Sequence, residues 1–232
     1  MPADRASPGA PPAGPRAPLA RPFLVGFAGG SGAGKTALVA AVRALLGPER
    51  VSALAQDAYY RDHPELAPEA RARLDFDAPE ALDQARFVAD LRALRRGEAV
   101  TPPVYCFATH RRVGFGPPVE PRPIVLVDGI LLFHDGEVRD LLDLRIFVDA
   151  PEALRLARRV ARDTRERGRT RAAVLRQCQA TVLPAHARWV EPTRAWADLV
   201  LLNAGRLEAA AEVAAAVIRA RLARLAAEPV VA

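Results

Sequence analysis

Residues 29–36, with the sequence GGSGAGKT, constrain the fold of this chain more than any other segment. They match G-x-x-x-x-G-K-[ST], the pattern of a phosphate-binding loop that joins a strand to a helix. Residues 23–28 predict the short buried strand, and residues 37–46 predict the helix, which ends at Gly47. The loop therefore lies where its backbone N–H groups can surround a triphosphate at a helix N-terminus.

Lys35 is the single lysine among the 33 lysine and arginine residues of the chain. A compact ammonium fits between phosphate oxygens, whereas arginine is a planar fork, so there is a chemical reason for lysine at this position. Lys35 is expected to reach the β- and γ-phosphates, and the hydroxyl of Thr36 to bind Mg²⁺. The residues predicted to bind the nucleotide phosphates are Gly29, Gly30, Ser31, Gly32, Ala33, Gly34, Lys35 and Thr36.

Apolar segments alternate with helical segments along the rest of the chain. Strands are predicted at residues 51–55, 124–129, 145–149 and 198–202, and helices at 81–96, 151–167, 171–190 and 207–226. This alternation predicts an α/β fold of the P-loop NTPase type, with a five-stranded parallel sheet flanked by helices. Prolines bracket residues 104–107, which predicts a β-hairpin that projects from the sheet within about residues 98–122.

Composition indicates one domain, residues 22–232, behind a disordered Pro/Ala-rich tail, residues 1–21. The sequence contains no run of about 18 apolar residues, so no membrane span is predicted. The tail lacks the apolar core of a signal peptide, and two cysteines form no disulfide framework, so a cytoplasmic protein with reduced thiols is expected. The net charge of +6 is a weak sign of nucleic-acid binding, because nine arginines lie within residues 155–176. Such a cluster equally suits an Arg-rich helical lid, about residues 155–177, over nucleotide phosphates.

Two acidic residues follow predicted strands directly. Asp57 comes after the second strand, and Asp128 ends the third. Residues just past the carboxyl ends of parallel strands face the ligand crevice of an open sheet, so both carboxylates are expected near the phosphate loop. Asp128 is predicted to hold Mg²⁺ together with Thr36. For Asp57 the sequence leaves a second interpretation open, the N-cap of a helix.

Six short motifs resemble the uridine-cytidine kinase family, in order and at family spacing, from about residue 23 to residue 202. The motifs are FAGGSGAGKT at 27–36, QDAYY at 56–60, FD at 76–77, PVY at 103–105, DGIL at 128–131, and RRVARD with ERGR at 158–163 and 166–169. The phosphate loop is common to many NTPases, whereas QDAYY and the arginine-rich lid motif are far more specific. The resemblance implies a P-loop kinase domain that transfers the γ-phosphoryl group of ATP to the 5′-hydroxyl of uridine or cytidine.

The resemblance also implies roles for individual residues. Asp57 corresponds to the general base, and Lys35, Arg162 and Arg167 to the other catalytic groups, with Arg169 binding the nucleotide. The residues that correspond to acceptor-binding positions are Asp77, Arg159 and Gln177 at the ribose, Tyr105 and His110 at the pyrimidine edge, and Tyr60, Phe76 and Phe107 against the base. Two alternatives stay open from the residues alone: His110 as a solvated loop histidine, and Phe107 as an ordinary core residue.

This chain departs from the family pattern at four places. It has Asp128 in place of a glutamate, Cys106 in place of an aspartate and Ala78 in place of a histidine, and residues 202–206 lack a Pro-Arg-Gly-Gly pattern. These departures leave open uridine against cytidine as acceptor, ATP against GTP as donor, and feedback by pyrimidine triphosphates.

Two further functions remain as alternatives: a related kinase for ribulose 5-phosphate or pantothenate, and a non-catalytic nucleotide-binding homologue. A guanine-reading GTPase is excluded, because its Asn-Lys-x-Asp element needs a second lysine. The expected partners are a small-molecule nucleoside and, by resemblance, further copies of the chain in a homo-oligomer, commonly a tetramer. Neither nucleic acid nor a membrane is expected as a partner.

Overall fold

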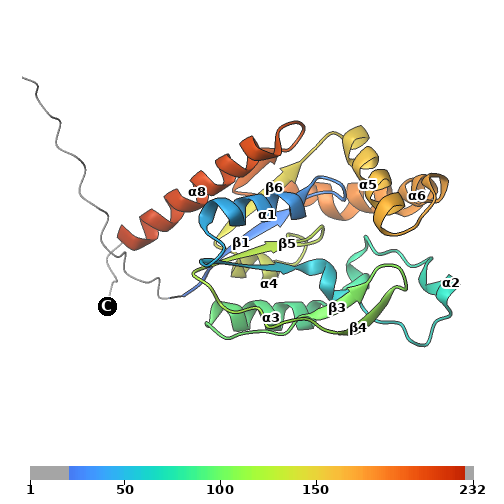
Figure 1. The fold of residues 1–232 in the computed structure, drawn as a ribbon, viewed down its shortest axis with the longest axis horizontal. Helices are drawn as coiled ribbons and strands as arrows, with labels where there is room; N and C mark the ends of the chain where they lie inside the picture. The colour runs from blue at the N-terminus through green and yellow to red at the C-terminus, as the bar shows by residue number, and fades with distance from the viewer. Residues whose placement is uncertain (1–20, 228–232) are drawn as a thin grey trace, which may run out of the picture.

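The computed structural model describes residues 21–227 of the chain (Figure 1). The predicted tail lies outside these residues except for Arg21. The Arg21 guanidinium pairs with Asp143, with 2.7 Å between Nη2 and Oδ1, so this residue is attached to the domain rather than to the tail. None of the helices within residues 21–227 is long and apolar enough to cross a membrane.

Five parallel strands form the central sheet, as predicted. They are β1 (Phe23–Ala28), β2 (Val51–Ala55), β5 (Ile124–Asp128), β6 (Leu144–Asp149) and β7 (Leu199–Leu202), in the order β2-β5-β1-β6-β7. In the sheet register Asp128 pairs with Phe27 of β1 and with Ala55 of β2. The carboxyl ends of these three strands therefore meet at one edge, where the phosphate loop begins.

Helices cover both faces of the sheet (Figure 1). Helices α1 (Lys35–Leu46) and α8 (Leu207–Ala227) pack on one face, and α3 (Gln84–Arg95) and α4 (Gly136–Leu141) on the other. Alternate residues of β1 enter the two cores: Val25 and Phe27 belong to the α1/α8 side, and Leu24 and Ala28 to the α3/α4 side. A strand buried on both faces needs apolar side chains throughout, which explains the continuous apolar run in the sequence.

The lid leaves the sheet after β6. The predicted lid consists of α5 (Glu152–Glu166) and α6 (Arg171–Gln177). The predicted helix over 171–190 is present, but it changes into wider π turns at Cys178–Val182 and His186–Val190, around the short α7 (Leu183–Ala185), before a 3-10 helix at Glu191–Trp196. Pro184 lies between the two π segments and has no N–H to donate, which accounts for an irregular helix here.

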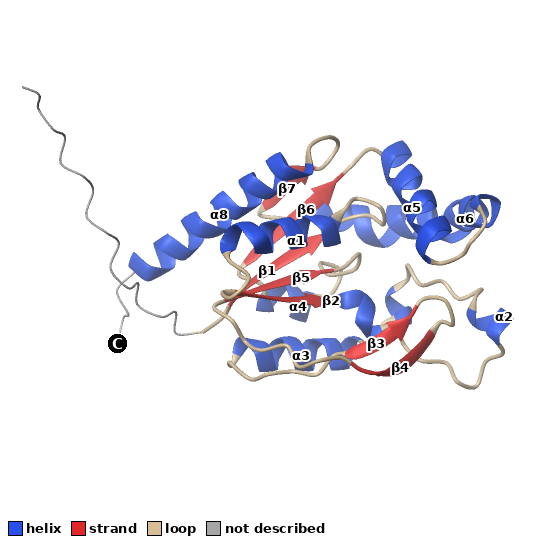
Figure 2. Cartoon of the chain, viewed as in Figure 1, coloured by secondary structure: helices blue, strands red, loops and turns tan. Residues whose placement is uncertain are grey.

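The segment between β2 and β5 forms the lower right part of the molecule in Figure 2. Strands β3 (Pro103–Cys106) and β4 (Arg111–Phe115) pair in an antiparallel two-stranded sheet, which confirms the predicted hairpin. Short helices precede them: a 3-10 turn at Gln56–Tyr59, α2 (Pro68–Arg71) and a 3-10 turn at Pro79–Ala81. Helix α3 begins later than the predicted residue 81, because the Asp83 side chain caps it by accepting a hydrogen bond from the N–H of Arg86.

Candidate active site

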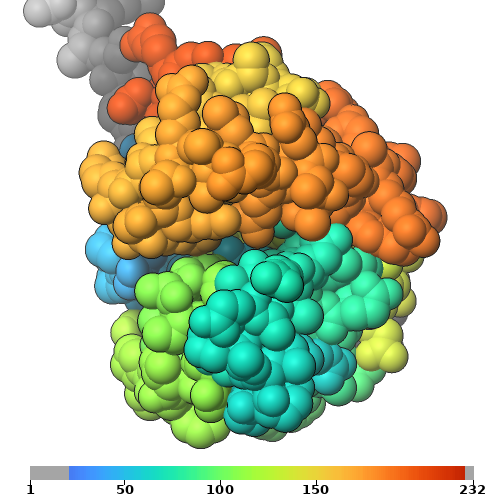
Figure 3. All heavy atoms as spheres, turned by 90° about the vertical axis from the view of Figure 1, so that its right-hand side faces the viewer, coloured from blue at the N-terminus to red at the C-terminus, as the bar shows by residue number. Residues whose placement is uncertain are grey.

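A cavity of about 580 Å³ lies where the phosphate loop, the strand ends, the lid and the hairpin meet. In Figure 3 the lid and the segment before the hairpin border a groove that leads to this region. Most of the predicted site residues line the cavity: Ser31, Gly32, Gly34, Lys35, Thr36, Asp57, Tyr60, Phe76, Asp77, Tyr105, Phe107, His110, Asp128, Arg159, Arg162, Arg167, Arg169 and Gln177. The predicted residues Gly29, Gly30 and Ala33 belong to the same loop but do not line the cavity.

The phosphate loop is built for a close approach of backbone. Gly29 has φ 137°, and a Cβ there would collide with the carbonyl oxygen of Val148, so only glycine fits. Lys35 begins helix α1, and its ammonium donates hydrogen bonds to the carbonyl oxygens of Gly29 at 2.8 Å and Gly30 at 3.1 Å. Burial lowers the pKa of Lys35 to about 8. A buried ammonium is thus held at the mouth of the loop, ready for an anion that would offset its desolvation.

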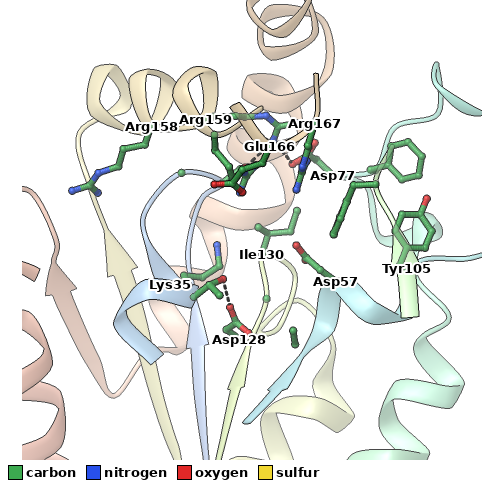
Figure 4. Close-up of a pocket in the computed structure, with 18 of the residues that line it drawn as sticks. Lys35, Asp57, Asp77, Tyr105, Asp128, Ile130, Arg158, Arg159, Glu166 and Arg167 are labelled. Atoms are coloured by element: carbon green, nitrogen blue, oxygen red, sulfur yellow. Dashed lines mark hydrogen bonds and ion pairs between the residues drawn. The ribbon is translucent and has the colours of Figure 1, made fainter. Parts of the chain in front are cut away.

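Asp128 lies at the floor of the cavity (Figure 4), and Thr36, on helix α1, also lines the cavity. The Thr36 hydroxyl donates to Oδ2 of Asp128 over 2.7 Å, and burial raises the pKa of this carboxyl. A hydroxyl and a carboxylate are the oxygen ligands that Mg²⁺ prefers, with the remaining positions taken by phosphates and water. Within residues 21–227 no group of three or more His, Cys, Asp or Glu side chains forms an all-protein metal site. The donor set therefore fits a magnesium ion that arrives with a nucleotide.

Asp57 lies in the 3-10 turn directly after β2, half-buried in the cavity wall. The alternative role of a helix N-cap is wrong, because Ala55 occupies the N-cap position of this turn and no side chain caps it. Its neighbour Gln56 turns inward, where Oε1 accepts a hydrogen bond of 3.1 Å from the N–H of Leu131. The buried glutamine fixes the turn, and the Asp57 carboxylate is left facing the cavity.

Aromatic side chains form the wall opposite the lid. The rings of Tyr60, Phe76, Tyr105 and Phe107 contact one another edge to face or tilted, with centroids between 5.3 and 6.3 Å apart. His110 stacks on Phe76 at 4.6 Å and 13°, and its φ of 53° is the one positive value among the described non-glycine residues. His110 is thus part of the wall rather than a solvated loop residue, while Phe107 both lines the cavity and packs against the core.

Two polar atoms in this apolar wall have no hydrogen-bond partner in the described chain. They are the hydroxyl of Tyr105 and Nδ1 of His110, both buried. Burial lowers the pKa of His110, and the charge of Arg169 adds to this effect, so the ring is neutral near pH 7. Because buried polar groups are nearly always hydrogen-bonded, these two atoms are available to bind the polar edge of a ligand in the cavity.

A polar bridge joins the aromatic wall to the phosphate loop. Arg159 lies 3.7 Å from the carboxylate of Asp77 and donates a 2.7 Å hydrogen bond to the hydroxyl of Ser31. Burial raises the pKa of Asp77, and the charge of Arg159 opposes that shift. Gln177 accepts hydrogen bonds from Arg159 at 3.5 Å and from Arg169 at 2.5 Å, so the predicted nucleotide ligand Arg169 lies beside predicted acceptor residues.

Arg158 and Arg167 of the lid lie at the top of the cavity in Figure 4. The Arg167 guanidinium stacks over the ring of Phe107 at 4.1 Å, and burial lowers its pKa. Sequence reasoning assigned no role to Arg158, Arg165, Glu166 or Ile130, which also line the cavity. Arg158, Arg165 and Glu166 lie in or beside the lid motif. The high density of charged residues in this motif is the one sequence signal that points to them.

The lid contacts the phosphate loop through Arg158. Its guanidinium donates to the carbonyl oxygens of Asn203 at 3.0 Å and Ala33 at 3.4 Å, and the Asn203 amide donates to Ala33 at 2.8 Å. Asn203 follows β7, so these bonds link the lid, the loop and the edge strand. No sequence motif predicted this contact.

Comparison with known proteins identifies similar sequences and structures. The model of the phosphoribulokinase / uridine kinase family matches residues 24–208. A uridine kinase from Chloroflexus aggregans is 42% identical over 201 residues, which are 87% of this chain and 96% of that protein. A uridine kinase from Leuconostoc citreum is 41% identical over 187 residues, 80% of this chain and 89% of that protein. Among solved structures, a proposed fructose transport system kinase from Silicibacter sp. has a TM-score of 0.66 and 28% identity, and covers 81% of this chain and 92% of that one.

Proposed function

Because this chain belongs to the phosphoribulokinase / uridine kinase family of kinases, we propose that it transfers the γ-phosphoryl group of ATP to the 5′-hydroxyl of uridine or cytidine. The products would be UMP or CMP, as in pyrimidine salvage. The relatives named uridine kinase support this acceptor, because they match the chain over most of their length. The same activity was expected from the sequence motifs.

The acceptor wall carries the proposal. It offers stacked aromatic surface and two buried polar atoms, the Tyr105 hydroxyl and Nδ1 of His110, which have no hydrogen-bond partner within residues 21–227. A pyrimidine has a flat apolar face and a polar edge, so it would fill the slot and give both atoms a hydrogen bond. A phosphorylated sugar such as ribulose 5-phosphate has no flat apolar face to stack on these rings. Arg159, a buried arginine beside the wall, faces Asp77.

Asp77 and Arg159 are proposed to bind the ribose hydroxyls. The carboxylate can accept from a hydroxyl and the guanidinium can donate to one, and the pair lies between the aromatic wall and the phosphate loop. Gln177, hydrogen-bonded to Arg159, would complete this side of the sugar. With the ribose held here, its 5′-hydroxyl would point toward the strand ends.

Asp57 is proposed to accept the proton of the attacking 5′-hydroxyl. It lies at the end of β2, between the aromatic wall and the Thr36–Asp128 pair, and it lines the cavity (Figure 4). Phosphoryl transfer depends mostly on positioning and on neutralisation of phosphate charge. Lys35, Arg162 and Arg167 would stabilise that charge, and the buried Lys35 would do so at low local dielectric.

ATP is proposed as the donor, with GTP as the alternative, and its triphosphate would be wrapped by the backbone of residues 29–36. Thr36 and Asp128 would hold Mg²⁺, which would neutralise part of the phosphate charge. The base of the donor would lie on the side of Arg158 and Asn203, where the chain lacks the expected Pro-Arg-Gly-Gly pattern. The donor preference therefore has to be measured.

An assay of ADP release with a panel of acceptors tests the proposal. The panel contains uridine, cytidine, ribulose 5-phosphate, pantothenate and, because of the Silicibacter structure, fructose, each with ATP or GTP. We expect uridine or cytidine to give the highest kcat/KM. A preference for a phosphorylated or sugar acceptor would replace the proposed acceptor, and nucleotide binding without transfer to any of them would indicate a non-catalytic homologue.

We also propose that the protein is cytoplasmic and that it forms a homo-oligomer, a tetramer by resemblance. Light scattering coupled to gel filtration measures the mass in solution directly. A mass equal to the 25.0 kDa of one chain would contradict the oligomer and leave the proposed chemistry unchanged.

A further inference from the structure

Asp163 on helix α5 is a fully buried carboxylate, with an exposed fraction of 0%, surrounded by four arginines. Its Oδ1 lies 3.0 Å from Arg162 and 3.5 Å from Arg167, and its Oδ2 lies 3.8 Å from Arg159 and 3.6 Å from Arg169. Of these contacts, that with Arg162 is the one hydrogen bond, and Oδ2 accepts none. The carboxylate therefore holds the guanidiniums near one another without occupying most of their donors.

The local chain geometry produces this convergence. Arg159 and Arg167 are four residues before and after Asp163, so their side chains share its face of the helix. Gly168, with φ 63°, turns the chain back, and the N–H groups of Arg167 and Arg169 both donate to the backbone carbonyl of Asp163. Four like charges at this spacing repel one another, and the buried anion between them offsets that repulsion.

Three of these arginines, Arg159, Arg167 and Arg169, also contact residues of the cavity. On the nucleotide side, Arg159 donates to Ser31 of the phosphate loop. On the acceptor side, Arg159 faces Asp77, Arg167 covers the ring of Phe107, and Arg169 donates to Gln177. Asp163 is thus the one carboxylate of the lid that touches every arginine joining the two half-sites.

We propose that Asp163 is a positioning residue that couples the two substrate sites: it fixes the lid arginines in the arrangement that both nucleotide and acceptor stabilise. This rests on the proposed function, since it needs an acceptor bound against Phe107, Asp77 and Gln177. Each substrate then raises the affinity of the other by the same factor, because coupling between two binding equilibria is reciprocal. Asp163 itself touches neither substrate, since its carboxylate is enclosed by the arginines.

Calorimetry tests the proposal on the intact protein. The dissociation constant of β,γ-imido-ATP with Mg²⁺ is measured with and without saturating uridine, and that of uridine with and without the ATP analogue. In the wild type, each ligand should lower the dissociation constant of the other by a factor of about five or more, and this coupling factor should be the same whichever ligand binds first. In Asp163→Asn, which keeps the shape and removes the charge, the factor should fall to about one while both ligands still bind.

Glu152→Gln is the matched control, because it removes an exposed carboxylate from the first turn of the same helix. It should keep the coupling factor of the wild type. If the role of Asp163 were purely structural, Asp163→Asn would bind both ligands more weakly but would keep the coupling factor of the wild type. That result would overturn the proposal. A factor of one in the wild type would overturn it as well.

A second variant covers the case in which Asp163→Asn does not fold. Arg169 is 30% exposed, so Arg169→Gln is expected to fold, and it removes one of the two arginines at Oδ2. Its coupling factor should drop at least about twofold, and retention of the full factor would contradict the proposal. If uridine is not phosphorylated, the proposed function fails independently, and the coupling is measured with the acceptor that the panel identifies.

Discussion

The phosphate loop and the acceptor wall occupy the same cavity, but they are built in different ways. The loop is mostly backbone: three of its glycines have positive φ, and its lysine is held by the loop's own carbonyl oxygens. The acceptor wall is made of aromatic side chains from three separate segments, namely the turn after β2, the loop before α3 and the hairpin, and the side chains of the lid face it. A backbone site tolerates few changes and binds one chemical group, whereas a side-chain site can be altered residue by residue.

The largest expected effect is at the loop. Lys35→Ala should lower kcat/KM by at least about 10²-fold, because removal of a preorganised charge from a buried site typically has this effect. Steady-state kinetics measure the change, with thermal unfolding as a check on the fold. Arg43→Ala removes an exposed charge from the same helix and should leave kcat/KM within about twofold, in line with a surface change. Near-normal turnover of Lys35→Ala would contradict the account of the loop.

Asp57 lies between the phosphate loop and the acceptor wall, so Asp57→Asn should affect the chemical step more than nucleotide binding. We expect kcat to fall by about 10²-fold or more, with a smaller change in KM for ATP, because a general base is typically worth 10²–10⁴-fold. Single-turnover measurements decide it, and an unchanged rate would remove Asp57 from the mechanism. Asp149→Asn is the control: it also ends a strand, but it pairs with Arg194 and should leave the rate unaltered.

The acceptor wall should distinguish ribose from deoxyribose. A missing 2′-hydroxyl would leave buried groups of Asp77 and Arg159 unpaired, at about 1–3 kcal/mol for each group. The wild type should therefore prefer uridine over 2′-deoxyuridine by roughly tenfold to a thousandfold in kcat/KM. Asp77→Ala should remove most of this preference and impair uridine more than deoxyuridine. Equal values for the two nucleosides in the wild type would show that the pocket does not recognise this hydroxyl.

The smallest expected effect is the pH dependence of acceptor binding. Burial and Arg169 lower the pKa of His110 below its usual 6.5, so the ring stays neutral at pH 7 and gains a proton only at lower pH. KM for uridine should be constant between pH 7 and 8 and should rise when the pH falls below the pKa of His110. The His110→Gln variant should lack the part of this rise that comes from protonation of the histidine. A rise of KM between pH 7 and 8 that is lost in His110→Gln would contradict the neutral histidine.

The same contrast decides what could be predicted from the sequence. The loop, the five strands and the hairpin are specified by local patterns, and all were predicted. The short helices α2 and α4 and the π turns around Pro184 were missed, because packing rather than local periodicity determines them. The contacts of Arg158 with Asn203 and the convergence on Asp163 join residues through tertiary structure. Asp163 was visible as part of a motif, but its burial was not.

Identification of the product tests the central claim most directly. After the protein is incubated with ATP, Mg²⁺ and uridine, ADP and phosphorylated uridine are quantified together, and the position of the phosphate is assigned by ³¹P–¹H NMR. The account predicts ADP and uridine 5′-monophosphate in equal amounts. ADP without a uridine monophosphate, or a phosphate on another hydroxyl, would contradict it.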